Sequence, residues 1–356
     1  MKFLRNAWYA AMWSMSLKDG ELAAQMILEE PLVFFRTPDG RVAALHDACP
    51  HRFAPLHKGK LGEDGRVTCA YHALQFDSSG QCVHNPHGAG RIPKGCKIRD
   101  YTVVEKHSLV WVWMGDQPAQ PELIPNYEFF DPNPKYEVSR RDQVIMNANF
   151  RLIMNNLLDL SHTPILHDGI LGYADDVKAE ITVREEGRYI YSCRTRKDSS
   201  PSPMADLLFR RDGKNVDAVS QMRWSAPCHL MNDTWTSPVG GASSEGAGIL
   251  GAHILTPITD RSTLYLFAAA RHGIRTPGDE STMEGIRNKM SDMRKHAFEQ
   301  QDEPMIEAQQ QYLDRFPDAR PLLLEIDAGP VRCNRILDAM IRSENEATAQ
   351  PAALPT

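Results

Sequence analysis

Short apolar runs separated by turn residues dominate the first third of the chain. Residues 32–36 (LVFFR), 42–48 (VAALHDA) and 108–114 (SLVWVWM) have the length and the β-branched and aromatic content of strands. The tripeptides PDG, EDG and SSG, which lie between such runs, are typical of tight turns. The pattern predicts an all-β N-terminal domain over residues 1–117, because a polar, Pro-containing stretch at 115–126 then interrupts it.

Helical and strand-like segments are mixed in the rest of the chain. Residues 149–162 predict a helix, strand-like runs continue to about residue 270, and 281–314 predicts a long helical segment. The expected fold is therefore α+β, with a C-terminal antiparallel sheet flanked by helices, helix-grip-like, over residues 118–342. The tail at 343–356 is small, polar and Pro-containing, so we expect it to be disordered.

Composition narrows the class of partner. The chain has 356 residues, 42% of them hydrophobic and 24% charged, and a formal net charge of −6, which gives no basic surface for a nucleic acid. No apolar segment approaches the roughly 20 residues that cross a bilayer, so we expect no membrane contact. The seven cysteines are odd in number and thinly spread, which favours a reducing compartment, and we expect the cytoplasm.

Two cysteine–histidine pairs lie close together in the first domain. Cys49 and His51 form Cys-x-His, and Cys69 and His72 form Cys-x-x-His after seventeen residues. A structural zinc site and four ordinary core residues are the alternatives, but zinc sites favour Cys-x-x-Cys at one or both ends. A Rieske [2Fe-2S] cluster fits this pattern best, with Cys49 and Cys69 on one iron and both imidazoles on the other.

A second group of polar residues lies in the predicted helix at 149–162. Asn155 or Asn156, Asp159 and His162 follow one another at three- and four-residue spacing within an otherwise apolar segment. Burying such a polar stripe without partners would cost free energy. A functional site explains the stripe, and the electron carried by a Rieske cluster needs such an acceptor.

His167 lies five positions after His162. Residues with this separation point about 140° apart on a regular helix, so the helix has to break for both imidazoles to reach one metal, and Pro164 between them can break it. Two histidines and one carboxylate form the facial metal site of non-haem Fe(II) oxygenases. Alternatively, the two histidines cap the helix or lie on the surface.

The long helical segment offers two carboxylates for this site, Asp302 and Asp292. The apolar residues Phe298, Met305 and Ile306 recur on the same helical stripe as Asp302, which predicts that this carboxylate faces the core. Asp292 shares its face with charged and polar residues. We therefore expect Asp302 to complete the metal site.

The combined motifs resemble the α subunits of Rieske non-haem iron oxygenases, in the group of vanillate O-demethylase, dicamba monooxygenase and toluenesulfonate methyl-monooxygenase. The similar segments cover nearly the whole chain: NAWYAA, the two cysteine–histidine loops, NNLLDLSHTPILH, GAHILTPIT, DEPMIEAQQ and IDAGPVRCNRILD. The resemblance implies that Asp302 is the carboxylate ligand and that Asn156 lies beside the iron. It also implies that Asp159 links His72 of one subunit to His162 of its neighbour in a homotrimer.

The resemblance further implies an activity. A separate flavin- or ferredoxin-type reductase would pass electrons from NAD(P)H to the cluster, and the iron site would use O₂ to hydroxylate a methyl carbon of the substrate. For an aryl methyl ether the hemiacetal product would collapse to a phenol and formaldehyde. A ring-dihydroxylating dioxygenase and a zinc-stabilised, non-enzymatic binding module are the alternative functions.

Two residues are candidates for binding the substrate, which we expect to be a small aromatic acid with a methoxy or methyl group. Asn232 and His253 match positions that bind the substrate's carboxylate and ether oxygens in dicamba monooxygenase, and both side chains can donate hydrogen bonds to an anion. In the alternative interpretation, Asn232 lies in a turn and His253 is an ordinary strand residue.

Overall fold

The computed structural model describes residues 2–133, 135–173, 179–274 and 279–349, and it confirms the predicted α+β fold. Its internal contacts divide the chain into two units. The N-terminal unit comprises Phe3–Ile124 with Thr256–Thr259, and the C-terminal unit comprises Pro125–Leu255 and the segment from Asp260 onward. The division between Ile124 and Pro125 lies inside the Pro-containing stretch 115–126.

The N-terminal unit consists of three small antiparallel sheets. Its apolar runs form strands because both faces are covered; every residue of LVWVW in Leu109–Trp113 is buried. The sheets have the orders β1-β11-β10, β2-β3-β4-β9 and β5-β6-β7-β8. Their strands are β1 (Trp8–Trp13), β2 (Ala23–Ile27), β3 (Glu30–Arg36), β4 (Val42–His46), β5 (Lys60–Leu61), β6 (Val67–Thr68), β7 (Gln75–Phe76), β8 (Cys82–His84), β9 (Asp100–Tyr101), β10 (Val103–Lys106) and β11 (Leu109–Trp113).

The C-terminal unit is built on one large antiparallel sheet. Its strand order is β12-β19-β18-β17-β16-β15-β14, and β13 also pairs with β19. The strands are β12 (Glu137–Val138), β13 (Asp142–Met146), β14 (Glu180–Glu186), β15 (Tyr189–Ser199), β16 (Val216–Ser225), β17 (His229–Pro238), β18 (Ala247–Thr259) and β19 (Ser262–Gly273).

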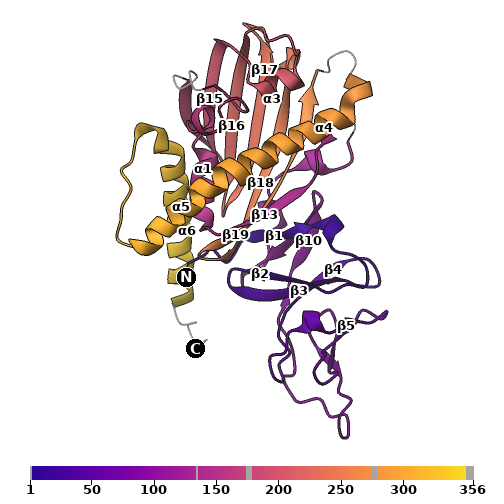
Figure 1. Cartoon of the computed structure of the whole chain (residues 1–356). Helices are drawn as coiled ribbons and strands as arrows, with labels where there is room; N and C mark the ends of the chain where they lie inside the picture. The colour runs from indigo at the N-terminus through magenta and orange to yellow at the C-terminus, as the bar shows by residue number, and fades with distance from the viewer. Residues whose placement is uncertain (1, 134, 174–178, 275–278, 350–356) are drawn as a thin grey trace. The chain divides into compact units, whose positions relative to one another are not determined.

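Helices flank this sheet, and Figure 1 shows α4 lying across one of its faces. The helices are α1 (Phe150–Leu158), α2 (Thr163–Leu166), α3 (Pro203–Leu208), α4 (Asp279–His296), α5 (Glu303–Arg315) and α6 (Ala328–Ala349). α1 contacts both α5 and α6. No helix within the described residues is both long and apolar enough to span a bilayer.

Two local predictions differ from the structure. Helix α6 continues through 343–349, so this part of the tail is helical, and residues 350–356 lie outside the described part. Its Ala and Glu residues favour helix, and extending an existing helix costs far less than nucleating one. The helix predicted at 149–162 ends at Leu158. Pro164 does not break it but lies in the first turn of α2, where proline is tolerated.

Candidate functional site

The first cysteine–histidine loop is a tight turn closed by backbone hydrogen bonds. The amide of Cys49 donates to the carbonyl of Ala54 at 2.9 Å, and the amide of Phe53 donates to the carbonyl of Cys49 at 2.7 Å. Phe53 has a φ of 58°, a left-handed conformation that is costly for a residue with a side chain. The turn directs the Cys49 side chain into the core of the unit, where the residue is 2% exposed.

The second loop repeats this backbone pattern. Cys69 donates to the carbonyl of Leu74 at 2.9 Å, the amide of Ala73 donates to Cys69 at 3.0 Å, and Ala73 has a φ of 56°. The two loops therefore present their cysteines in equivalent ways, although one motif has an additional residue before its histidine. Strain of the same kind at matched positions is typical of a built site.

The four predicted cluster ligands lie together. The Cys49 and Cys69 thiols contact each other and form no disulfide, and the ring centroids of His51 and His72 are 4.4 Å apart. Burial, with Cys69 adjacent, raises the pKa of the Cys49 thiol to about 11, so a bound metal has to displace that proton. Two buried thiols and two neighbouring imidazoles are the donor set of a Rieske cluster.

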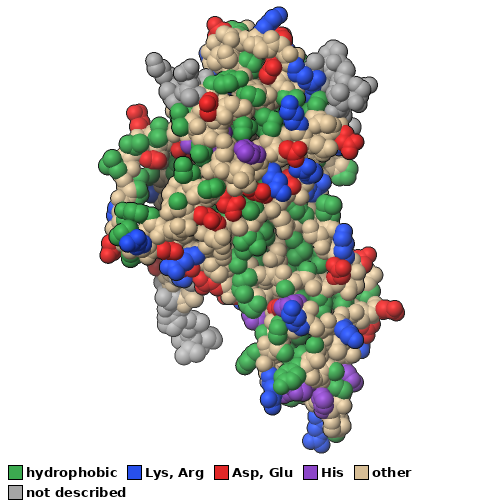
Figure 2. Space-filling model, in the orientation of Figure 1, with side chains coloured by type: hydrophobic (Ala, Val, Ile, Leu, Met, Phe, Trp, Pro, Cys, Tyr) green, Lys and Arg blue, Asp and Glu red, His purple; other side chains and the backbone are tan. Residues whose placement is uncertain are grey.

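Other histidines of this unit lie near the cluster ligands, and two of them form hydrogen bonds. Figure 2 shows purple histidine side chains on the surface over the β5 region labelled in Figure 1. His87 Nε2 lies 2.8 Å from the carbonyl oxygen of His72 and so supports the second loop. The amide of His57 donates to Asp47 at 2.8 Å, and its Nδ1 contacts the same carboxylate.

In the C-terminal unit, the break after α1 brings His162 and His167 together. Their ring centroids are 5.2 Å apart, because the chain turns at Asp159 and restarts as α2 with His162 as its N-cap. Asp302 enters from the end of the π-helical turn Ala297–Asp302, which joins α4 to α5. Such π-helical turns occur frequently at functional sites.

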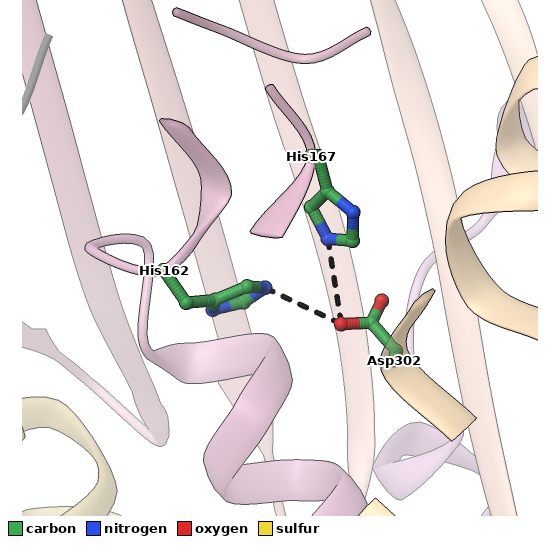
Figure 3. Close-up of side chains that lie close together, drawn as sticks. All are labelled: His162, His167 and Asp302. Atoms are coloured by element: carbon green, nitrogen blue, oxygen red, sulfur yellow. Dashed lines mark ion pairs between the residues drawn. The ribbon is translucent and has the colours of Figure 1, made fainter. Parts of the chain in front are cut away.

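These three side chains form a compact donor set (Figure 3). Asp302 Oδ1 lies 3.5 Å from His162 Nε2 and 3.4 Å from His167 Nε2. An ion bound at about 2.1 Å to each donor separates neighbouring donors by about 3.0–3.5 Å. The geometry could therefore hold one metal ion, with the remaining coordination positions open to small ligands.

The alternative carboxylate, that of Asp292, lies outside this donor set. Asp292 has a side chain that is 66% exposed and pairs with Arg140 at 2.7 Å, whereas Asp302 is 2% exposed. The prediction that Met305 faces the core on the same helical stripe as Asp302 is wrong, because Met305 is 55% exposed. The π-helical turn contains an additional residue, which rotates the positions after Asp302 relative to a regular helix.

Hydrogen bonds orient both imidazoles toward Asp302. His162 Nδ1 lies 2.5 Å from the backbone carbonyl of Asp159, and His167 Nδ1 lies 2.8 Å from Gln301 Oε1. Because these oxygens accept the Nδ1 protons, the Nε2 atoms are left as metal donors. Burial lowers the pKa of His162; for His167 the adjacent Asp302 carboxylate outweighs burial and raises its pKa.

Asn156 completes this arrangement by donating from Nδ2 to Asp302 Oδ1 at 2.9 Å. Asn155 points elsewhere and accepts from Asn334 Nδ2 at 2.7 Å, which decides between the two asparagines. The Asp159 carboxylate accepts from the amide of Ser161 at 2.8 Å and also from its hydroxyl. It therefore turns away from His162 Nδ1, which lies 3.9 Å from Oδ2.

A cavity of about 140 Å³ opens beside the His162–His167–Asp302 group. An apolar cavity of about 150 Å³ holds one benzene ring, so this one accommodates a single six-membered ring. Its apolar wall includes Leu160, Met204, Leu208, Ile249 and Phe298. A largely apolar cavity with few polar groups is typical of a small-molecule site.

Both candidate substrate residues line this cavity. Asn232 lies in the middle of β17, paired with Met222 and Gly251, and so is not in a turn. His253 on β18 is 5% exposed, and its Nδ1 lies 2.5 Å from the Tyr265 hydroxyl. Burial lowers the pKa of His253 well below its usual range, so this histidine is neutral.

Several residues of the site were not among those predicted from the sequence. Gln301, which orients His167, directly precedes the predicted ligand Asp302. Arg294 lines the cavity and precedes Phe298 and Asp302 at successive four-residue steps, a spacing that could have revealed it. Arg194 and Arg196 also line the cavity. They lie on one face of β15, but the alternation of side chains along a single strand does not show which face of the sheet a helix covers.

Both halves of the chain match known families. Residues 7–102 match the Rieske [2Fe-2S] domain, and residues 146–343 match the vanillate O-demethylase oxygenase C-terminal domain. The oxygenase component of dicamba O-demethylase from Stenotrophomonas maltophilia is 34% identical over 97% of this chain and 99% of its own. The iron–sulfur subunit of a toluene-4-sulfonate monooxygenase system from Comamonas testosteroni is 33% identical over 98% and 99%.

Solved structures agree with these matches. The crystal structure of dicamba monooxygenase bound to 3,6-dichlorosalicylic acid has a TM-score of 0.88 at 33% identity, covering 98% of this chain and all of that one. The Rieske match confirms the predicted iron–sulfur cluster over zinc. The chain therefore belongs to the vanillate O-demethylase group of Rieske non-haem iron oxygenases, as the oxygenase component of a monooxygenase system.

Proposed function

We propose that the protein hydroxylates a methyl substituent of a small aromatic acid, with oxidative O-demethylation of a methoxybenzoate-like compound as its main reaction. The observation that carries this proposal is the single-ring cavity of about 140 Å³ beside the two histidines and the carboxylate. Relatives are named for dicamba, vanillate and toluene-4-sulfonate, which are single-ring aromatic anions with a methoxy or methyl group.

We assign the metal ligands residue by residue. Cys49, His51, Cys69 and His72 would hold the [2Fe-2S] cluster. His162, His167 and Asp302 would hold the mononuclear iron, since their Nε2 and carboxylate oxygen atoms converge and the histidine Nδ1 atoms are already bonded. When bound, this iron supplies the activation of O₂.

The proposed reaction consumes one O₂, two electrons and two protons for each methyl group hydroxylated. One oxygen atom of O₂ is inserted into a C–H bond of the methoxy methyl group. The other oxygen leaves as water after taking up two electrons and two protons. The hemiacetal then loses formaldehyde and leaves a phenol. A separate reductase supplies the electrons, as the name "oxygenase component" implies for the relatives.

The chain's own contribution is to hold the substrate and exclude water. The apolar wall formed by Leu160, Ile249 and Phe298 packs against the ring and keeps bulk water from the reacting methyl group. Asn156 donates to Asp302 and so fixes the carboxylate that would neutralise part of the charge of a bound metal. Asn232 and neutral His253 would face the substrate's polar substituents from the sheet.

Formaldehyde analysis tests the reaction type. The holoenzyme, a reductase, NADH and O₂ are incubated with 2-, 3- and 4-methoxybenzoate, and formaldehyde, phenolic product and cis-diol are measured. We expect equal amounts of formaldehyde and hydroxybenzoate from at least one isomer. A cis-diol without formaldehyde would instead support ring dihydroxylation and contradict the proposal.

We infer that the active form is a homotrimer in which Asp159 connects His72 of one subunit to His162 of the next. Two exposed apolar residues flank the cluster histidines; Phe53 is 79% and Tyr71 60% exposed, which favours a protein surface docking there. Light scattering of the purified protein should give three times the 40.1 kDa chain mass. We further infer a cytoplasmic location, because none of the seven cysteines forms a disulfide.

Gln301→Leu tests how His167 is oriented. The substitution removes the oxygen that accepts the His167 Nδ1 proton and keeps a similar volume. We expect mononuclear iron affinity or turnover to fall about 10- to 100-fold, with the Rieske absorption spectrum unchanged. Gln300→Leu is the matched control, since Gln300 is exposed; equal losses in both variants would contradict the specific role of Gln301.

A further inference from the structure

Arg294 is a buried cation at the cavity whose guanidinium has an unsatisfied nitrogen. The residue is 5% exposed and lines the cavity, and its Nη2 has no hydrogen-bond acceptor among the described residues. Burial lowers its pKa to about 10, so it remains positively charged at neutral pH. A buried donor without an acceptor is costly, so a cavity that retains one is suited to a ligand that supplies the acceptor.

Neighbouring rings hold the guanidinium in place. Its central carbon lies 5.7 Å from the ring centroid of Phe267 and 5.8 Å from that of Phe298, distances typical of cation–π contacts. Phe298 lies one helical turn from Arg294 and one from Asp302. The helix therefore carries a cation and the proposed iron ligand on either side of one aromatic ring.

Other polar groups converge on the same point, beside Gly251. A Cβ atom built on Gly251 would lie 3.3 Å from His253 Nε2, 3.5 Å from Asn232 Cβ and 4.0 Å from Arg294 Nη2. A side chain at position 251 would crowd these atoms, so the glycine allows the three residues to lie close together at this point of the cavity wall. Because the Tyr265 hydroxyl can donate to His253 Nδ1, the Nε2–H of neutral His253 can donate at this point.

Charge along the cavity also favours an anion. Arg194, Arg196 and Arg294 line it, and Asp302 is the one carboxylate among the described residues that line it. Asp302 is already engaged by Asn156 and the two histidines. Near Gly251, an anionic ligand would meet the Arg294 guanidinium and the neutral His253.

We propose that Arg294 is the main specificity-determining residue for substrate charge, and that it binds the carboxylate or sulfonate of the substrate through a bidentate contact beside Gly251, assisted by His253 and Asn232. This inference rests on the proposed function, because it names the substrate class of that site. A planar guanidinium matches the two oxygens of a carboxylate better than an ammonium does.

Calorimetric binding to the iron-loaded protein without reductase or O₂ tests this proposal. The probes are 3-methoxybenzoate, toluene-4-sulfonate and the neutral 3-methoxybenzamide. We expect the wild type to bind both anions at least about 10-fold more tightly than the amide. Arg294→Met should bind the anions about 10- to 100-fold more weakly and the amide about equally well, since charge-assisted hydrogen bonds account for that range.

Two further variants keep the test decisive. Arg294→Lys retains the charge but loses the fork, so its affinity for 3-methoxybenzoate should be lower than that of the wild type, a comparison that stands even if the methionine variant fails to fold. Arg287→Met is the matched control, because Arg287 lies on the same helix but does not line the cavity, and it should bind all probes normally. Equal binding of acid and amide by the wild type, or unchanged anion affinity in Arg294→Lys, would overturn the proposal. Binding needs no turnover, so absent formaldehyde would count against the proposed reaction alone.

Discussion

Replacing Asp302 by alanine is expected to remove the mononuclear iron while the Rieske cluster remains. The substitution leaves two imidazoles without the carboxylate that lies 3.4–3.5 Å from both Nε2 atoms. A catalytic metal contributes several kcal/mol to lowering a reaction barrier, and about 1.4 kcal/mol corresponds to tenfold. Product formation should therefore fall at least about 1,000-fold, and iron analysis should give about two irons per chain in place of about three.

Asp292→Ala provides the matched control for this variant. Asp292 lies in the same run of helix, but its exposed side chain forms an ion pair with Arg140 on the surface, and exposed ion pairs contribute about 0–1 kcal/mol. Its iron content, visible spectrum and turnover should match those of the wild type. If Asp292→Ala lost the iron and Asp302→Ala kept it, the ligand assignment would be wrong.

Asp159→Asn is expected to stop electron transfer and leave both metal sites loaded. His162 is oriented by the backbone carbonyl of Asp159, which the substitution preserves, so iron content should not change. The carboxylate itself is a quarter exposed and is therefore accessible to a neighbouring subunit. If the trimer is as proposed, reoxidation of the reduced Rieske centre in a single turnover should slow about 100-fold. This is the upper end of the loss seen when a residue that bonds a metal ligand is removed.

Ser161→Ala separates this role from a structural one. It removes the hydroxyl that contacts the Asp159 carboxylate but keeps the negative charge. We expect normal reoxidation in Ser161→Ala and nearly none in Asp159→Asn, with both variants trimeric. If the two variants slowed equally, or if Asp159→Asn reoxidised at the normal rate with full iron, the carboxylate would have no part in electron transfer.

Local spacing carries enough information to predict the cluster loops. Cys49 and His51 are two residues apart and Cys69 and His72 three apart, so one tight turn brings each pair together without distant contacts. The burial of Asp302 is predictable for a related reason, because helical periodicity places this residue with buried Phe298. In both places the geometry is determined by a few neighbouring residues.

The course of the chain around the iron site could not be predicted in the same way. Helix α1 ends at Leu158 because Asp159 adopts extended angles and bonds Ser161, a local competition that helical periodicity does not reveal. The π-helical turn at Ala297–Asp302 likewise leaves no periodic signal. Arg194 and Arg196 are recognisable as cavity residues only in the folded sheet, because alternation along β15 does not show which face is covered.

Metal analysis combined with EPR of the reduced protein tests the central claim most directly. If the chain holds a Rieske cluster and a separate mononuclear iron, the purified protein should contain about three irons per chain and show a Rieske signal on reduction. The same signal should persist in Asp302→Ala with about two irons. A colourless protein that contains zinc and no iron, with no EPR signal after reduction, would contradict the account.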